Sequence, residues 1–514
     1  MASEVSGGQG GEFVELPHFT IDERSVRLLE YDFCLEHQVV VLGKAGPVGG
    51  LVTVGMLHPA RRSLVSRLSA TLGRQVQPVR LSPWEIRRAL DQGYGRLDEE
   101  RRDVLLLRPI QDFSFRADAE APELLDEILG HAAQLGAGDV HIETYDQDVD
   151  VRFRIDGVLH QVATPLSPAT VQAALTRLKV LANLDIAERR RAQDGRVRAV
   201  YEEPDGRSRT LDFRLSVVPG PFGEDAVLRV LDGSAPMLGL ERLGFTDSTR
   251  ATFERMIENP EGLILVTGPT GSGKTTTLYS AIDRISSPTR KILTVEDPIE
   301  YYFPKTNQKQ VSVTMGFADY GRAFMRQNPD VILIGEIRDE ETASVALRAA
   351  QTGHLVLSTL HTTDSVRMVS RLHTLGIDLD LMAGSLLGAI SQRLLRRLCP
   401  HCRRETPATE AESRRLRLGA GEGPFFTPAG CEACGGRGYK GRIGVYELFA
   451  MDAELADLVA ERAPVHRLRA KAIERGMRTL LEDALDKARA GITSLAEVVR
   501  AVPYRLIEED RPSI

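Results

Sequence analysis

The stretch GLILVTGPTGSGKTTTLYSAI, residues 262–282, joins an apolar strand, a glycine-rich loop and a helix. It matches the pattern G-x-x-x-x-G-K-[ST] with Gly268, Gly273, Lys274 and Thr275. Glycines at these positions let backbone N–H groups close around a phosphate at the N-terminus of a helix. Because the flanking strand and helix are both present, we interpret the stretch as a phosphate-binding loop and not as a fortuitous glycine-rich turn.

This loop predicts where a nucleotide and its magnesium ion bind. Lys274 can reach the β- and γ-phosphates, and the Thr275 hydroxyl can ligate Mg²⁺. Thr276 and Thr277 serve mainly to begin the helix. The predicted nucleotide-binding residues are Gly268, Pro269, Thr270, Gly271, Ser272, Gly273, Lys274, Thr275 and Thr276.

Further apolar strands follow the loop and alternate with helices. KILTVED, VILIGEI and HLVLSTLH are short and continuously apolar, which is typical of a parallel sheet covered on both faces. The sequence therefore predicts an α/β fold for this part of the chain.

Acidic residues stand at the ends of two of these strands. In NPDVILIGEIRD, Glu336 can orient and polarise an attacking water, while the preceding position, often an acid that binds Mg²⁺, is Gly335. Magnesium must then depend on Thr275, water and another acid. The candidates lie in TVEDPIEY and are Glu296, Asp297 and Glu300; a solvated strand-end carboxylate is the alternative for each, more so for Glu300 than for Glu296.

Two histidines flank the strand in TGHLVLSTLHTTDS. A lone histidine is usually structural, but His354 and His361 stand at the ends of a strand expected to neighbour the phosphate loop. The pattern favours a γ-phosphate sensor or a coupling element, with a structural role as the open alternative.

Four of the five cysteines form two C-x-x-C pairs separated by 28 residues, in LCPHC and GCEAC. Such a set predicts a tetrahedral zinc site that leaves no open position for catalysis, and a redox pair is the alternative. The predicted ligands are Cys399, Cys402, Cys431 and Cys434. The remaining Cys34 is interpreted as a small buried hydrophobic residue.

Composition and patterning set the remaining expectations. A net charge of −7 disfavours a dedicated binder of nucleic acid or anionic membrane, and no signal peptide or membrane-spanning stretch is evident. We therefore expect a cytoplasmic protein. The Asp-Gly pairs at Asp156-Gly157 and Asp205-Gly206 predict the turns of two β-hairpins. The expected segments are a tail (1–12), an N-terminal α/β partner-binding domain (13–115), an α+β domain (116–233), a linker (234–245), the ATPase core (246–396), a tetracysteine subdomain (397–445) and a helical region (446–514).

The motifs GPTGSGKT, TVEDPIEY, RQNPDVILIGEIRD and TGHLVLSTLHT, in this order, resemble the secretion ATPases of the type II secretion and type IV pilus class. The middle segment adds DVHIE, RFRIDG, LDIAERRRAQDGR and GEDAVLRVLD, although AQDGR replaces the more usual PQDGR. The resemblance covers about residues 120–505. It implies a RecA-like P-loop domain preceded by a small PAS-like domain, and a homo-hexamer that binds ATP between these two domains.

The resemblance also assigns roles to single residues. It places Lys274 and Thr275 in a Walker A motif, Glu336 in a Walker B motif, and Glu296 with Asp297 and Glu300 in an aspartate box. His354 and His361 belong to a histidine box. The arginines that the middle domain supplies to the phosphates would be Arg196, Arg214 and Arg229, with solvent-facing arginines as the alternative.

The function that the resemblance implies is an ATP-hydrolysing motor at the cytoplasmic face of the inner membrane, with Mg²⁺ and zinc as cofactors. It would power type II secretion by assembling a pseudopilus through inner-membrane platform proteins, or alternatively assemble a type IV pilus. Assembly motors of this class carry the tetracysteine, which retraction motors generally lack. A RecA-like helicase is disfavoured by the acidic balance and only 5% aromatic residues, and a nucleotide-sensing scaffold by intact Lys274 and Glu336.

Overall fold

The structure is a computed structural model that describes residues 23–42, 50–81, 86, 89–90, 93, 105–110, 115–116, 119–203, 205–232, 238–303, 305–419 and 421–511. The expected N-terminal tail and the start of the expected linker lie outside these residues. Among the helices that the structure describes, none combines the length and the apolar character needed to cross a membrane.

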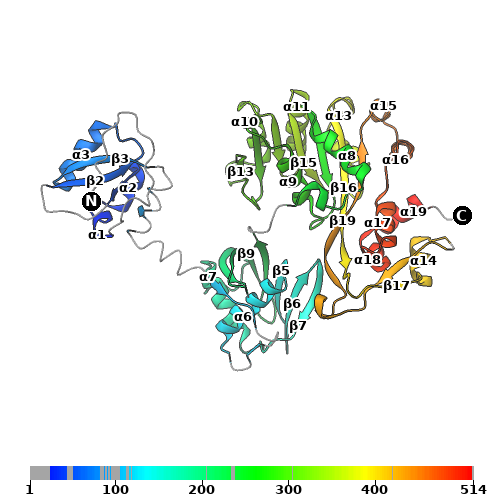
Figure 1. The fold of residues 1–514 in the computed structure, drawn as a ribbon, viewed down its shortest axis with the longest axis horizontal. Helices are drawn as coiled ribbons and strands as arrows, with labels where there is room; N and C mark the ends of the chain where they lie inside the picture. Colours follow the sequence, from blue (N-terminus) through cyan, green and yellow to red (C-terminus); the bar gives the residue numbers. More distant parts are fainter. Residues whose placement is uncertain are drawn as a thin grey trace. The chain divides into compact units, whose positions relative to one another are not determined.

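The N-terminal part, blue in Figure 1, contains a three-stranded sheet whose strands follow the order β1-β2-β3. β1 and β2 are antiparallel, whereas β2 and β3 are parallel and are joined by α3, which ends at Gly73 in the left-handed conformation. The apolar residues of these strands and helices form one buried cluster that includes Cys34, so the expectation of a buried hydrophobic cysteine is confirmed. The elements are α1 (Glu23–Val26), α2 (Tyr31–His37), β1 (Val39–Leu42), β2 (Leu51–Met56), α3 (Arg62–Leu72) and β3 (Gln75–Arg80).

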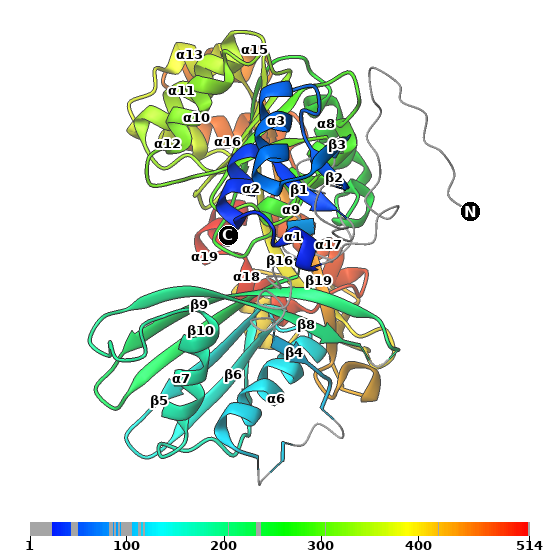
Figure 2. The ribbon, with the colours of Figure 1, turned by 90° about the vertical axis from the view of Figure 1, so that its left-hand side faces the viewer.

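The middle part is built on a seven-stranded sheet in the order β4-β8-β9-β10-β5-β6-β7. Its strands alternate buried and accessible residues, so one face packs against apolar side chains and the other is polar. Figure 2 shows α6 and α7 together against one face of this sheet. The elements are β4 (Leu105–Leu107), α6 (Ala121–Gln134), β5 (Asp139–Thr144), β6 (Val149–Ile155), β7 (Val158–Val162), α7 (Val171–Leu181), β8 (Gln193–Glu202), β9 (Ser208–Pro219) and β10 (Glu224–Asp232).

Both expected hairpins are present. Asp156 and Gly157 connect β6 to β7 with φ values of 50° and 85°, which is the positive-φ pair of a type I′ turn. Gly206, with φ of 83°, lies in the turn between β8 and β9, and these strands pair antiparallel.

The third part contains the phosphate-loop sheet, in the order β13-β12-β14-β15-β11-β16-β19. All neighbouring pairs from β13 to β16 are parallel, and only the β16–β19 pair is antiparallel. The α/β prediction with a parallel sheet is therefore confirmed. The strands are β11 (Gly262–Thr267), β12 (Ile292–Glu296), β13 (Asn307–Gln310), β14 (Val331–Ile334), β15 (Leu355–Leu360), β16 (Leu386–Leu398) and β19 (Tyr439–Ala450).

Helices cover both faces of this sheet (Figure 1). Alternate strand residues point to opposite faces, so Leu263 and Leu265 join one apolar cluster while Ile264 and Val266 join the other. The second cluster is formed with η3 (Leu240–Arg242), α8 (Asp247–Ile257) and α9 (Lys274–Ile285). The first is formed with α10 (Phe317–Phe324), α11 (Glu340–Gln351), α12 (Met368–Thr374), α13 (Leu379–Ser385), α15 (Ala453–Ala460) and α16 (Val465–Glu474).

β16 and β19 pair along most of their length, from Gly388↔Ala450 to Leu398↔Tyr439. The segment between them carries the four cysteines, and the last helices pack on the far half of the pair around Leu395 and Val445. The remaining elements here are β17 (Arg404–Thr406), α14 (Glu410–Leu416), β18 (Phe425–Thr427), η4 (Glu432–Cys434), α17 (Leu480–Arg489), α18 (Leu495–Ala501) and α19 (Tyr504–Asp510).

Candidate nucleotide site and metal centre

The loop between β11 and α9 has the backbone shape of a phosphate cradle. Gly268, Gly271 and Gly273 all have positive φ values, of 146°, 75° and 87°. A Cβ atom at position 268 would lie 2.6 Å from both the Gln392 carbonyl oxygen and the Ser272 Oγ atom. Only glycine therefore fits at this first position, both for its conformation and for its space.

Lys274 begins α9, and its ammonium group folds back over the loop. Its Nζ atom donates to the carbonyl oxygens of Gly268 and Pro269 at 3.0 and 3.2 Å. Burial lowers the pKa of Lys274, and the negative charge of Glu336 partly opposes this shift. The lysine is thus held in the mouth of the loop, within electrostatic reach of Glu336.

The residues present fit a bound phosphate. The N-terminal N–H groups of a helix have no partners within the helix, and those of α9 follow directly on the loop. The Ser272 Oγ atom is buried in the same loop and has no hydrogen-bond partner among the described residues. Thr275 stands in the first turn of α9, where its hydroxyl group is available to a metal ion beside the phosphates.

Glu336 follows β14 at the carboxyl edge of the sheet. Its side chain is 20% exposed and pairs with Arg338, which also lies 3.7 Å from Asp297. The position before it is tightly enclosed, because a Cβ atom on Gly335 would lie 3.1 Å from the Phe317 ring and 3.2 Å from the Val295 carbonyl oxygen. This crowding explains physically why a glycine stands where an acid is often found.

His361, directly after β15, lies beside this glutamate. Its Nε2 atom is 3.5 Å from Glu336 Oε2. Two hydroxyl groups of β15 bind the end of β14. Ser358 Oγ and Thr359 Oγ1 donate to the carbonyl oxygens of Ile334 and Gly335 at 2.6 and 2.8 Å. The structure therefore brings together His361, Glu336 and the phosphate loop at one edge of the sheet.

Glu296 occupies a different environment from the open metal ligand that its sequence position suggested. Its carboxylate is buried and accepts hydrogen bonds from Thr294 Oγ1 at 2.6 Å, from Gln308 Nε2 at 3.1 Å and from the Tyr279 hydroxyl group. Burial and the Glu296 charge raise the pKa of Tyr279, so this phenol stays protonated and donates. Glu296 thus holds β12 against α9, while Asp297 stays close to Glu336 through Arg338.

His354 lies away from the site. It precedes β15 at the amino edge of the sheet, and the six residues of that strand place it about 23 Å from His361 along the chain. Its Nδ1 atom lies 2.9 Å from the carbonyl oxygen of Ala349 at the end of α11. The two histidines therefore stand at opposite edges of the sheet, at the two ends of one strand as the sequence predicted, and only His361 lies beside Glu336.

The three arginines expected to reach the phosphates share the polar face of the middle sheet. Arg196 on β8 and Arg214 on β9 are direct cross-strand partners. Arg229 on β10 also lies among the accessible positions that alternate with the buried ones. Asp194 and Asp212 stand on the same face, and Asp212 pairs with Arg198 at 3.3 Å, so these arginines lie among carboxylates.

One residue of this site was not identified from the sequence. Gln392 on β16 donates from Nε2 to the Ser272 carbonyl oxygen at 2.6 Å, and its Oε1 atom accepts from Thr277 Oγ1 at 2.8 Å. A buried amide within the apolar strand LLGAISQRLLRRL was the available signal, because a buried polar side chain needs partners.

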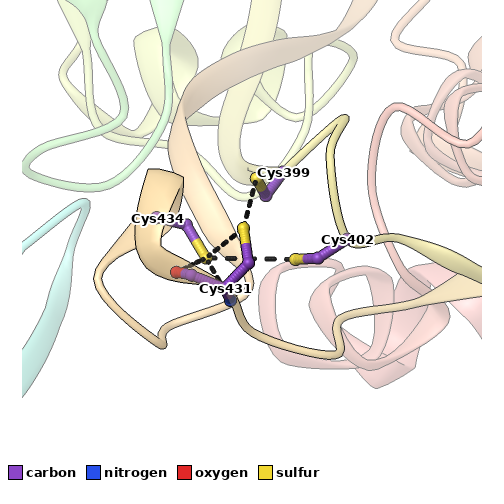
Figure 3. A group of neighbouring side chains, drawn as sticks. All are labelled: Cys399, Cys402, Cys431 and Cys434. Atoms are coloured by element: carbon purple, nitrogen blue, oxygen red, sulfur yellow. Dashed lines mark hydrogen bonds between the residues drawn. The ribbon is translucent and has the colours of Figure 1, made fainter.

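The four paired cysteines converge on one point (Figure 3). Their Sγ atoms all lie within 4.8 Å of one another, with Cys399–Cys431 at 3.8 Å, Cys402–Cys434 at 3.9 Å and Cys431–Cys434 at 3.8 Å. Four thiolates at Zn–S bonds of about 2.3 Å in a tetrahedron have S···S separations of about 3.8 Å. The backbone N–H groups of Cys431 and Gly438 donate to Cys434 Sγ at 3.2 and 3.1 Å, an arrangement that suits a thiolate. The donor set therefore fits tetrahedral zinc.

Two known family models match most of this chain. Residues 116–500 match the model described as "Type II/IV secretion system protein", and residues 10–100 match the MshEN domain. The chain belongs to the type II/IV secretion system protein family. The expected resemblance is confirmed, and the matched range includes the phosphate loop, Glu336 and His361.

Curated relatives of this family are named for both of the systems that the sequence analysis considered. The type IV pilus assembly ATPase PilB of Myxococcus xanthus is 39% identical over 96% of this chain and 89% of its own length. The type II secretion system ATPase E of Vibrio cholerae is 44% identical over 74% of this chain and 75% of its own length. The type II secretion system protein E of Dickeya dadantii is 40% identical over 92% of this chain and 96% of its own length.

Among solved structures, the Legionella pneumophila ATPase DotB matches with a TM-score of 0.55 and 23% identity, covering 79% of this chain and 99% of its own. This likeness supports the fold. The prediction that the chain is an ATPase is confirmed by the family and by the names of its relatives. The family implies ATP and Mg²⁺ as ligands of the phosphate-loop site.

Proposed function

We propose that this chain is a hexameric motor that hydrolyses ATP and powers type II protein secretion by driving assembly of a pseudopilus. The observation that carries the proposal is the placement of Glu336 and His361, 3.5 Å apart, at the same sheet edge as the phosphate loop. Around that point the chain offers a carboxylate that can position water and a lysine that can bind phosphate, which are groups that phosphoryl transfer to water uses, with an imidazole beside the carboxylate.

In this proposal Glu336 orients the attacking water. Its two oxygens contact Arg338 and His361, and each retains acceptor capacity for a water molecule. Lys274, already turned into the loop, would exchange its backbone carbonyl partners for phosphate oxygens. Thr275 would hold Mg²⁺, which supplies positive charge beside the phosphates when bound.

The middle sheet would supply further positive charge. Guanidinium groups stabilise charge that develops on the transferred phosphoryl group, and losing such a group costs roughly 10³-fold or more in rate. We assign this role to Arg196, Arg214 and Arg229, because all three stand on one polar face. His354, at the far edge of the sheet, would serve in coupling.

The site of work would be the cytoplasmic face of the inner membrane. Hydrolysis would change the relation between the middle and ATPase domains, and the hexamer would pass that motion to inner-membrane platform proteins, with the N-terminal domain choosing the partner. The tetracysteine segment would hold zinc and stiffen the end of the β16–β19 pair, through which force can pass.

A second candidate is type IV pilus assembly. It is supported by the match to the Myxococcus xanthus pilus assembly ATPase, which extends over 96% of this chain, beside the 92% that the Dickeya dadantii type II protein matches. The two candidates share the catalytic site and differ in the filament that the motor extends.

Two measurements test the proposal. The purified full-length chain should release phosphate from ATP only with Mg²⁺ and elute as a hexamer by light scattering; an inactive chain would refute the motor. A gene deletion in the source organism should abolish secretion of extracellular proteins and leave surface pili intact. Loss of pili with normal secretion would instead select the second candidate.

A further inference from the structure

The strand β16 carries two consecutive polar residues, Gln392 and Arg393, that are almost fully buried beside the phosphate loop. Gln392 is 1% exposed and Arg393 is 6% exposed. β16 lies next to the phosphate-loop strand β11, with Ser391 in register with Thr267, the last residue before the loop. Because successive side chains of a strand point to opposite faces, these two residues reach different neighbours.

Gln392 forms hydrogen bonds with the phosphate loop and with the helix that follows it. Its carboxamide bridges the Ser272 carbonyl oxygen and the Thr277 hydroxyl group, at 2.6 and 2.8 Å. Its own carbonyl oxygen fills the space beside Gly268. A shift of the loop when phosphate binds would therefore change the contacts that the backbone and side chain of Gln392 make with it.

Arg393 holds the segment that carries His361. Its Nη2 atom donates to the Thr363 carbonyl oxygen at 2.7 Å, two residues beyond His361. Its Nη1 atom donates to the Gln392 carbonyl oxygen at 2.8 Å, which is the same oxygen that crowds Gly268. The guanidinium group therefore connects the floor of the phosphate loop to the His361 segment by two hydrogen bonds.

The same segment is fixed again just beyond this point. Ser365 donates through its backbone N–H and its hydroxyl group to the buried Glu447 carboxylate on β19, at 3.0 and 2.7 Å. Glu447 is also bound by Arg469 of α16 at 3.0 Å. The segment after His361 is thus anchored at Ser365. Arg393 holds the Thr363 carbonyl oxygen between this anchor and His361.

The arrangement of Arg393 differs from that of an ordinary structural ion pair. Within the described ranges, no carboxylate oxygen comes within 4.0 Å of its guanidinium group, which donates instead to the two backbone carbonyl oxygens. Burial lowers the pKa of Arg393, and the charges of Glu447 and Asp364, beyond ion-pair distance, partly oppose this shift. A lysine would retain the charge but lacks the planar fork that serves two separate acceptors.

We propose that Gln392 and Arg393 are positioning residues that transmit phosphate binding in the loop to the segment carrying His361. Gln392 senses the loop, and Arg393 sets the distance of His361 from Glu336. Neither residue touches the nucleotide in this scheme. The proposal rests on the proposed ATPase function, because it assigns His361 and Glu336 to the same reaction.

Turnover by the full-length protein tests the scheme first. Arg393→Met should lower kcat for ATP by about 10- to 100-fold, since misplacement of a catalytic group by about 1 Å can cost 10²-fold. KM for ATP should change less than threefold, and Arg393→Lys should recover part of the loss. The matched control is Arg397→Met, which removes an exposed arginine from the same strand and should leave kcat unchanged.

A double-mutant comparison separates positioning from general destabilisation. If Arg393 acts through His361, the pair Arg393→Met and His361→Ala should be no slower than His361→Ala alone. Multiplying losses, or a KM effect without a kcat effect, would overturn the proposal.

Hydrogen exchange of residues 361–367 gives a readout that needs no hydrolysis. With a non-hydrolysable ATP analogue, the wild-type segment should become protected, and Arg393→Met and Arg393→Lys should bind the analogue yet lose most or part of that protection. Equal protection in wild type and both variants would overturn the inference. A wild-type chain that binds the analogue but releases no phosphate would refute the proposed function while this exchange comparison still decides the inference.

Discussion

His361 and Glu336 face each other at the carboxyl edge of the central sheet, with 3.5 Å between the His361 Nε2 atom and the nearer Glu336 carboxylate oxygen. The histidine is half exposed and the glutamate 20% exposed. Both are therefore accessible to water and to a ligand in the neighbouring phosphate loop. His354 lies at the opposite edge, so the two histidines make a matched pair for mutation.

His361→Ala should reduce kcat for ATP by about 10²-fold, because it removes the imidazole that contacts the water-orienting carboxylate. His354→Ala should cost less than about tenfold in the same assay, since its ring packs against the end of α11. Steady-state phosphate release at saturating Mg-ATP measures both. Equal losses for the two variants would contradict the placement of the active edge.

Gly335→Ala should destabilise the protein by about 1–3 kcal/mol, because the added methyl group meets the Phe317 ring and the Val295 carbonyl oxygen at 3.1 and 3.2 Å. Gly384→Ala is the control. It lies in α13, where nothing stands within 4 Å of the new atom, so it should be neutral or mildly stabilising. Urea unfolding measures both, and a neutral Gly335→Ala would show that the site has room for a side chain.

Cys399→Ser should release the zinc that the tetracysteine cluster is proposed to hold and lower the thermal midpoint, while the phosphate-loop residues stay in place. The wild-type chain should contain one zinc per chain by elemental analysis. Cys34→Ser is the control, because Cys34 lies in the N-terminal cluster, where burial raises its pKa to about 12. Unchanged zinc content in Cys399→Ser would contradict the assignment of the metal centre.

Glu497 of α18 binds Arg396 of β16, and we expect acid to weaken this contact. Burial works to raise the pKa of Glu497, but hydrogen bonds from Arg500 and Arg396 outweigh it and lower the pKa. A lowered folded-state pKa gives stability that is present above the unfolded value of about 4.3 and is lost as pH falls through the folded value.

Glu497→Gln should therefore unfold more easily at pH 7, by about 2–3 kcal/mol, because the partly buried Arg396 loses the carboxylate of the buried Glu497. The variant should also show a flatter loss of stability below pH 5 than the wild type. Urea unfolding across this pH range measures both effects. Parallel curves for the two proteins would show that Glu497 does not carry the acid sensitivity.

The parts of the site that the sequence predicted are contiguous in the chain. The phosphate loop from Gly268 to Thr275 is one strand, turn and helix start, so its geometry follows from local residue types. Glu336 was placed correctly at a strand end because parallel strands share one carboxyl edge. The two C-x-x-C pairs are short local knuckles, and pairing them needed only the recurrence of one spacing.

What the sequence did not reveal depends on distant pairing. Gln392 meets Ser272 across 120 residues, and Arg393 meets Thr363 only because β16 pairs with β11. The enclosure of Glu296 required the neighbouring Tyr279 and Gln308, which arrive from a helix and an edge strand. The separation of the two histidines, by contrast, follows from the six-residue strand between them.

The most direct test of the account is phosphate release by purified full-length Glu336→Gln at saturating Mg-ATP, beside the wild type and with nucleotide binding measured on the same samples. The carboxamide keeps the size of the side chain but cannot accept a proton from water. We predict that the variant binds ATP as the wild type does and hydrolyses it at least about 10²-fold more slowly. Turnover within a few-fold of the wild type would contradict the assignment of Glu336 as the residue that activates water.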